Sequence, residues 1–242
     1  MSVTESCHAQ AAAADTAFLS RAQTAAEAAY HQAVGVQTHL YNGTEYIDYR
    51  MFYLEGNQFF ASNVFTPGDI YYDGAWFRQT PLLYDVVKDE VVTIHNSSGK
   101  KITLITAKVD TFLLHGHLFV RYAADSTAQA SLPKAGFYDV LYNKDVRFLV
   151  RRSKNIQERA TQGGMEGEFR NGDKLYLWKD GAYYQVSSKK SVLNVLKDKK
   201  KQLRKYASAH HLKFGKQREG TILALTQYYD SLSDGRPADK TN

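Results

Sequence analysis

The sequence predicts an α+β protein, mainly an antiparallel β sheet or open barrel with an N-terminal helix and a C-terminal helical segment. Between residues 68 and 122, short β-branched and aromatic runs alternate with Gly, Asn and Asp turns, the usual pattern of strands and hairpins. The 242 residues include 17 Tyr and 12 Phe, which suit half-buried pleated surfaces. Apolar residues at three- and four-residue spacing are confined to 15–35 and 187–232, where we expect helices.

The N-terminal part is expected to contain one helix and a disordered end. Residues 1–14 are polar and rich in Ala, and we expect disorder there. Asp15 is a suitable N-cap for a helix over 15–35 that ends near Gly35. Its weakly apolar stripe is expected to pack across one end of the sheet, with a partner-binding role as the alternative.

Residues 36–186 are expected to form the antiparallel β domain. Asn42-Gly43 predicts a first hairpin that joins 36–40 to 45–49, and the meander over 68–122 follows. Residues 136–142 and 146–150 are expected to pair. The polar stretch 154–167 is expected to be a mobile loop around Gly163-Gly164, and Asn171-Gly172 to be a hairpin turn before the strand at 175–178.

Residues 187–232 are expected to form a basic helical segment, followed by a disordered tail at 233–242. Ser187 or Ser188 is a suitable N-cap, and a break is expected near 211–215. Between residues 187 and 218 there are eleven Lys and Arg against Asp198 alone. The chain has a net charge of +6, so the rest of it is net acidic, and the basic character belongs to one segment.

Aromatic side chains beside two similar turns are the first candidates for a binding surface. Tyr-Tyr-Asp-Gly-Ala-Trp-Phe at 71–77 and Trp-Lys-Asp-Gly-Ala-Tyr-Tyr at 178–184 both place aromatic residues around an Asp-Gly turn. Tyrosine and tryptophan form stacking surfaces for sugars and other ligands. The candidate binding residues are Tyr71, Tyr72, Trp76, Trp178 and Tyr183, with filling of the core as the alternative role.

The order of motifs over residues 35–235 resembles a family of uncharacterised exported, β-rich proteins of Bacteroidetes-type bacteria. The resemblance depends on Tyr-Tyr-Asp-Gly at 71–74, Pro-Leu-Leu-Tyr-Asp at 81–85, Gly-Phe-Tyr at 136–138, and the Lys-rich helix followed by Tyr228-Tyr229. It implies a periplasmic or cell-envelope location and no catalytic motif. We therefore expect a non-catalytic protein whose β surface binds a protein or a glycan.

An enzyme is the first alternative, namely a metal- or carboxylate-dependent hydrolase. His115 and His117 flank Gly116 and are weak candidates for metal ligands, without an evident third ligand. Asp85 and Asp89 are a candidate carboxylate pair. The sequence has no nucleophile elbow, P-loop or dinucleotide fingerprint, so we expect no cofactor.

Binding of an anionic surface by the C-terminal segment is the second alternative. Lys199, Lys200 and Arg204 are candidates for contacts with phosphates of nucleic acid or membrane, against the commoner role of a solvated helix face. Nucleic acid is not the expected partner, because no base-reading motif accompanies them.

The sequence lacks an 18-residue apolar run and an evident signal peptide, so the cytoplasm is the alternative location. Cys7 is the single cysteine, which excludes an intrachain disulfide framework.

Overall fold

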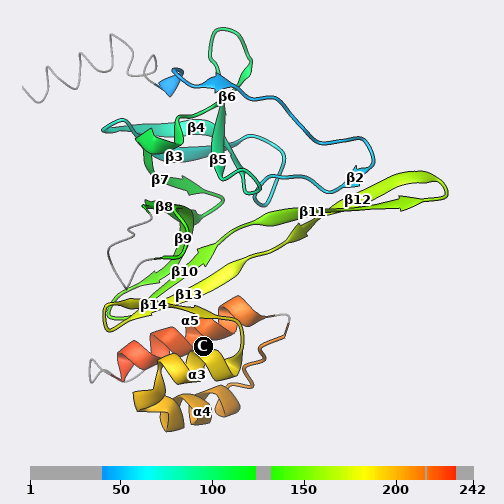
Figure 1. Cartoon of the computed structure of the whole chain (residues 1–242). Helices are drawn as coiled ribbons and strands as arrows, with labels where there is room; N and C mark the ends of the chain where they lie inside the picture. The colour runs from blue at the N-terminus through cyan, green and yellow to red at the C-terminus, as the bar shows by residue number, and fades with distance from the viewer. Residues whose placement is uncertain (1–39, 124–131, 216, 233–242) are drawn as a thin grey trace, which may run out of the picture. The chain divides into compact units, whose positions relative to one another are not determined.

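The computed structural model describes residues 40–123, 132–215 and 217–232, and the chain from Gly43 onward forms one compact unit. Strands in a mainly antiparallel sheet precede three C-terminal helices (Figure 1). The predicted α+β class is therefore confirmed. The helix predicted at 15–35, the ends predicted to be disordered and Cys7 lie outside the described residues.

The main sheet has eleven strands within the described residues, and each neighbouring pair is antiparallel. Across the sheet they are β1 (Thr44–Glu45), β6 (Lys101–Thr103), β5 (Glu90–Ile94), β4 (Ala75–Asp85), β3 (Thr66–Tyr72), β7 (Val109–Leu114), β8 (His117–Tyr122), β9 (Gly136–Asn143), β10 (Arg147–Arg151), β13 (Lys174–Lys179) and β14 (Ala182–Val186). A short 3₁₀ helix, η1 (Thr106–Lys108), precedes β7. In this part of the chain β1 and β14 have one neighbour each, so the sheet does not close on itself.

Three two-residue turns set the register of the hairpins. Both central residues have positive φ in Asp73-Gly74, His115-Gly116 and Asp180-Gly181, as a type I′ turn requires. The predicted Asp-Gly hairpins are therefore confirmed. The hairpin predicted around Asn42-Gly43 is not described, since 36–39 lie outside the described residues, and β1 pairs with β6.

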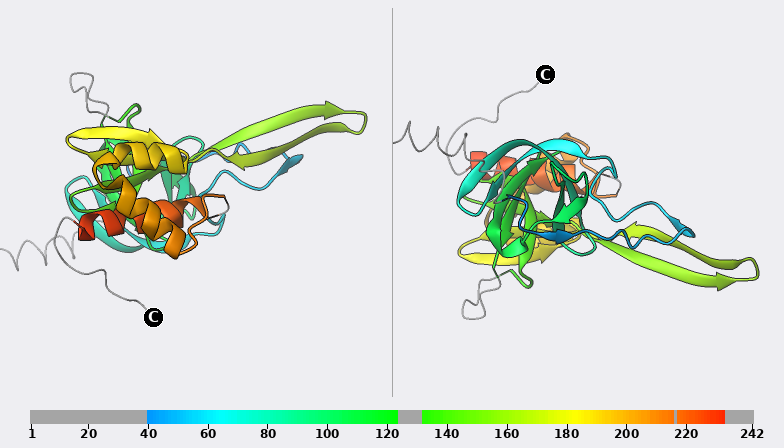
Figure 2. Two further views of the ribbon diagram at one scale, coloured as in Figure 1. Left: turned by 90° about the horizontal axis from the view of Figure 1, so that it is seen from below. Right: turned by 90° about the horizontal axis from the view of Figure 1, so that it is seen from above.

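One long hairpin runs from the main sheet into a projecting ribbon. Strand β11 (Lys154–Thr161) pairs with β12 (Gly164–Asn171) in the register that joins β10 to β13: Arg151 faces Lys174, and Lys154 faces Asn171. The ribbon extends away from the sheet in both views of Figure 2. Residues 154–167 are thus not the loop that we predicted, because their side chains alternate with the period of a strand.

The predicted turn at Asn171-Gly172 is also wrong. These residues lie between collinear strands, and the Gly172 amide donates to the Ser153 carbonyl at 2.8 Å while the Ser153 hydroxyl donates to the Gly172 carbonyl at 2.8 Å. Asn171 and Gly172 therefore pair across the long hairpin and do not form a turn. Strand β2 (Leu54–Glu55) adds to β12 in parallel, beside Gly167 and Glu168 in the middle of the ribbon.

Three helices cover the β10–β13–β14 part of the sheet (Figure 1): α3 (Lys189–Val195), α4 (Lys200–Ala209) and α5 (Arg218–Ser231). The turn η2 (Lys197–Lys199) joins α3 to α4. Ser188 caps α3 in a reciprocal capping box with Ser191. Leu203, Ile222 and Leu225 pack on Phe148 in one buried cluster, so the helical segment shares a core with the sheet.

Candidate functional site

One face of the ribbon is mainly apolar, with Glu158 in its middle, and the opposite face is charged. Because successive residues of a strand point to opposite sides, the register places Ile156, Phe169, Ala160 and Met165 on one face. Ile156 and Met165 are 37% and 46% exposed. Phe148 and Val150 precede Ile156 at even spacing in the same hairpin, so the apolar face continues the face that the helices cover at the base.

The opposite face of the ribbon carries paired charges. Arg159 bonds Glu166 at 2.8 Å, its cross-strand neighbour, and Arg170 pairs with Glu168. These pairs are exposed, so they contribute little to the stability of the ribbon. This face therefore suits contact with water, whereas the opposite face exposes Ile156 and Met165 on either side of Glu158.

A segment beside the ribbon adds exposed apolar side chains. The Tyr53 hydroxyl donates to Glu158 at 2.7 Å, and the Gly167 amide donates to the Tyr53 carbonyl at 3.3 Å. Phe52 and Met51 are 97% and 53% exposed. Large apolar groups gathered in this way are typical of surfaces that contact another molecule.

The outer edge of the ribbon is unpaired. In the three-stranded sheet β11 neighbours β12 alone among the described residues, so the outward-pointing amides and carbonyls along β11 have no strand beside them. Natural proteins usually cover or shorten such edges. Strand β11 is eight residues long and almost wholly exposed.

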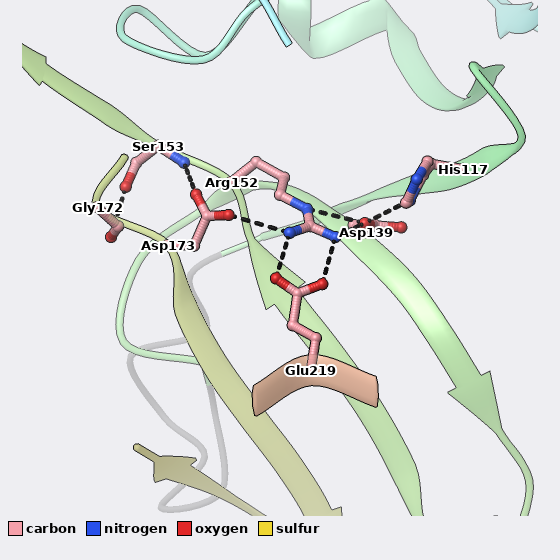
Figure 3. A network of polar contacts seen from close by, with 7 residues as sticks. All are labelled: His117, Asp139, Arg152, Ser153, Gly172, Asp173 and Glu219. Atoms are coloured by element: carbon pink, nitrogen blue, oxygen red, sulfur yellow. Dashed lines mark hydrogen bonds and ion pairs between the residues drawn. The ribbon is translucent and has the colours of Figure 1, made fainter. Parts of the chain in front are cut away.

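Arg152 holds the base of the ribbon to the sheet and to helix α5 (Figure 3). Its guanidinium donates to Asp139 at 2.6 Å, to Glu219 at 2.6 Å and to Asp173 at 3.0 Å. His117 Nδ1 lies 2.8 Å from the same Asp139 oxygen. Asp139 is fully buried, so Arg152 compensates a carboxylate that burial would otherwise destabilise.

The two carboxylates considered for hydrolysis both hold the fold together. Asp85 is fully buried and accepts hydrogen bonds from the Tyr46 hydroxyl at 2.9 Å and the Tyr49 hydroxyl at 2.8 Å. Asp89 accepts from Tyr84 at 2.6 Å and from Arg151 at 2.9 Å. Burial, reinforced by Asp85, raises the pKa of Tyr46 and of Tyr49, so both tyrosines stay neutral donors.

The two histidines have different surroundings. Within the described residues no three side chains of His, Cys, Asp and Glu form a metal-ligating group. His115 is exposed in its turn, where φ is +52°. His117 points to Asp139 and packs edge-on against Phe60, with ring centroids 5.1 Å apart.

The five aromatic candidates lie beside two different turns and differ in their exposure. Tyr71 and Trp76 stack obliquely at 5.3 Å across β3 and β4, with Trp76 46% exposed, whereas Tyr72 is fully buried. Trp178 faces Tyr183 across β13 and β14. All but Tyr72 are thus at least partly accessible.

The basic candidates differ in their surroundings. Lys199 lies over the Tyr229 ring at 4.4 Å and donates to the Tyr229 carbonyl at 3.2 Å, which ties η2 to α5. Lys200 is half-buried and Arg204 is exposed on α4. The structure therefore leaves Arg204 accessible and gives Lys199 a role in helix packing.

Sequence reasoning missed the ribbon residues Phe52, Ile156 and Met165. The signal for Ile156 and Met165 was present as alternation over 154–161 and 164–171, but apolar residues are too sparse there for a strand to be evident. Phe52 precedes a two-residue strand whose parallel pairing no local pattern indicates.

Comparison with known proteins supplies no relative. No family model matches the chain, and neither a curated protein nor a solved structure does. The resemblance to exported proteins therefore stays a prediction. Among the helices of the described residues, none is both long enough and apolar enough to cross a membrane.

Proposed function

We propose that this chain is a non-catalytic recognition protein that binds another protein through the β11–β12 ribbon. The observation that carries the proposal is an eight-residue edge strand next to an apolar face on a hairpin that projects from the sheet. The partner supplies an extended segment that pairs with β11, as in strand addition. A location in the cell envelope, which the family resemblance implies, is part of the same proposal.

Stability considerations support this function. A two-stranded hairpin exposed on both faces is marginally stable in water, and an unpaired strand edge favours association. Arg152, with its three carboxylate partners, anchors the base of the ribbon at a cost in desolvation that a passive loop would not require. Pairing along β11 would satisfy the open edge and cover Ile156 and Ala160.

The test compares two variants that introduce the same charge on opposite faces of β11. Ile156→Glu places a carboxylate on the apolar face, and Gln157→Glu places one on the polar face. A photocrosslinking residue at Ala160 is expected to give one discrete adduct with another protein in extracts of cells that make this chain. Ile156→Glu should reduce the yield at least about tenfold, whereas Gln157→Glu should leave it within about twofold.

Hydrogen exchange on the purified adduct then distinguishes strand addition from other contacts. Amides of β11 should become protected from exchange while those of α4 stay unchanged. An adduct with a second copy of this chain would indicate that the ribbon binds another copy of itself and would contradict binding of a different protein. Equal loss of adduct in both variants, or unprotected β11 amides, would contradict the proposal.

A further inference from the structure

A cleft beside the base of the ribbon lies at the junction of six chain segments. Its walls come from the β4–β5 turn at 86–90, η1 at 106–107, the end of β8 at 121–122, the loop at 133–136, the β10–β11 junction at 151–155 and residues 172–176 around the start of β13, with a cavity volume of about 790 Å³. Cavities of about 300–1,000 Å³ hold small-molecule ligands. The cleft is therefore large enough for an oligosaccharide of a few units.

The cleft is strongly basic although the chain outside the C-terminal segment is net acidic. Its basic residues are Lys88, Arg121, Lys134, Arg151, Lys154 and Lys174. Its acidic residues are two, Asp89 and Glu90, and Asp89 is neutralised by Arg151 at 2.9 Å. An excess of cations in a concave site attracts anions, because low-dielectric walls concentrate the field.

Several of these cations are available to a ligand. Lys134 and Lys174 are exposed, and neither has an ion pair within the described residues. Lys174 lies opposite Arg151 across β10 and β13, so the two cationic residues are neighbours in the cleft wall. Arg151 is buried and paired with Asp89, so Lys134 and Lys174 supply the positive charges that a carboxylate or sulfate group could reach.

Aromatic rings continue from the cleft along the sheet. Tyr122 and Tyr176 line the cleft, and Tyr138 packs edge-on against both, at centroid distances of 5.5 and 5.8 Å. Tyr138 and Tyr176 are buried, so they support the partly exposed Tyr122 from behind. Tyr122 also contacts Tyr183 at 6.3 Å, which in turn faces Trp178. Sugar rings pack on such aromatic side chains, while their charged groups require cations.

The walls of the cleft are already held in place. Arg151 donates to the Ala135 carbonyl at 2.8 Å and to Asp89, which links two walls. At Gly136, φ is +134° and an added Cβ would lie 1.9 Å from an Asp89 oxygen, so only glycine allows this close approach. A preformed site loses little entropy when a ligand binds.

We infer that this cleft binds an acidic oligosaccharide, with carboxylates near Lys134 and Lys174 and a sugar ring against Tyr122. Cations alone fit any anion, but the partly exposed Tyr122 ring beside them fits a ligand with sugar faces. The cleft includes Lys154 and Asn155, the first residues of β11, so the proposed saccharide and protein surfaces adjoin at the base of the ribbon.

Calorimetric titration of the purified chain with galacturonic acid trimer tests the inference. Maltotriose, which has sugar rings without charge, and inorganic phosphate, which has charge without rings, are the comparison probes. The acidic trimer should bind at least about tenfold more tightly than either, since each lacks one of the two contacts. Binding should weaken as salt is added.

A pair of charge-matched variants distinguishes the cleft from general attraction. Lys134→Gln with Lys174→Gln removes two cleft cations, and Lys190→Gln with Lys205→Gln removes two exposed cations of the helical segment. The first pair should weaken the trimer about tenfold and the second less than twofold. Equal loss in both pairs, equal affinity for maltotriose or phosphate, or no binding of the trimer would overturn the inference.

Discussion

Asp85 shows how a single carboxylate organises one side of the sheet. Its oxygens accept the Tyr46 and Tyr49 hydroxyls, and also the amides of Val87 at 2.9 Å and Lys88 at 3.0 Å. These bonds fix the β4–β5 turn, which is a wall of the basic cleft. Asp85, which the sequence offered with Asp89 as a candidate pair for the alternative hydrolase function, therefore has a structural role.

Removal of the Asp85 carboxylate should destabilise the protein strongly. Asp85→Ala leaves two buried or half-buried tyrosine hydroxyls and two amides without their acceptor, so we expect a loss of about 3 kcal/mol in the free energy of unfolding, measured by urea denaturation. Glu45→Gln is the control, because the Glu45–Lys100 pair is exposed and should contribute less than about 0.5 kcal/mol. Similar unfolding midpoints for both variants would refute the structural role.

Tyr122 makes the stability of the protein depend on pH in the alkaline range. Burial, with Tyr183 beside it, raises the pKa of Tyr122 from 10.0 to about 12. Below pH 10 both the folded and unfolded states hold the proton. Between pH 10 and about 12 the unfolded state loses it first, so the free energy of unfolding falls as pH rises. Urea titrations between pH 10 and about 12 should show a smaller fall in the free energy of unfolding for Tyr122→Phe than for the unchanged protein. The same dependence on pH in both proteins would contradict the raised pKa of Tyr122.

At the scale of elements, two glycines should respond in opposite directions to replacement by alanine. Gly136 begins β9 with φ +134° and has Asp89 where a Cβ would lie, whereas Gly220 lies in α5 with nothing within 4 Å of a Cβ. Gly136→Ala should cost about 3 kcal/mol, since strain and steric overlap add. Gly220→Ala should stabilise by about 0.5 kcal/mol, since alanine favours the helix.

Thermal unfolding of the two glycine variants measures both effects in one experiment. The melting temperature should fall for Gly136→Ala and rise slightly for Gly220→Ala. Gly136→Ala should also weaken trimer binding in the cleft, because the Asp89–Arg151 link must shift. A Gly136→Ala protein with an unchanged melting temperature would mean that loop 133–136 adapts without cost.

At the scale of the whole molecule, charge is distributed in a way that the net value conceals. The basic helical segment carries most of the excess charge, yet the cleft gathers a second basic region from 88, 121, 134, 151–154 and 174. Around the ribbon, four glutamates at 55, 158, 166 and 168 outnumber Arg159 and Arg170. Anionic ligands should therefore prefer the cleft and the helices to the ribbon.

The sequence by itself determined the features that depend on neighbouring residues. Asp73-Gly74 and Asp180-Gly181 form the predicted turns, Ser188 caps the predicted helix, and strand runs appear where β-branched and aromatic residues cluster. Each depends on backbone preferences within a few residues, and these are readable from a short window.

The ribbon, the Arg152 network and the cleft became evident only in the tertiary structure. Arg152 could not be assigned to Asp139, Asp173 and Glu219, because these partners lie 13, 21 and 67 residues away. The cleft likewise joins segments from residue 86 to residue 176. Such contacts form only when strand order and register bring distant segments together, and no local periodicity carries that information.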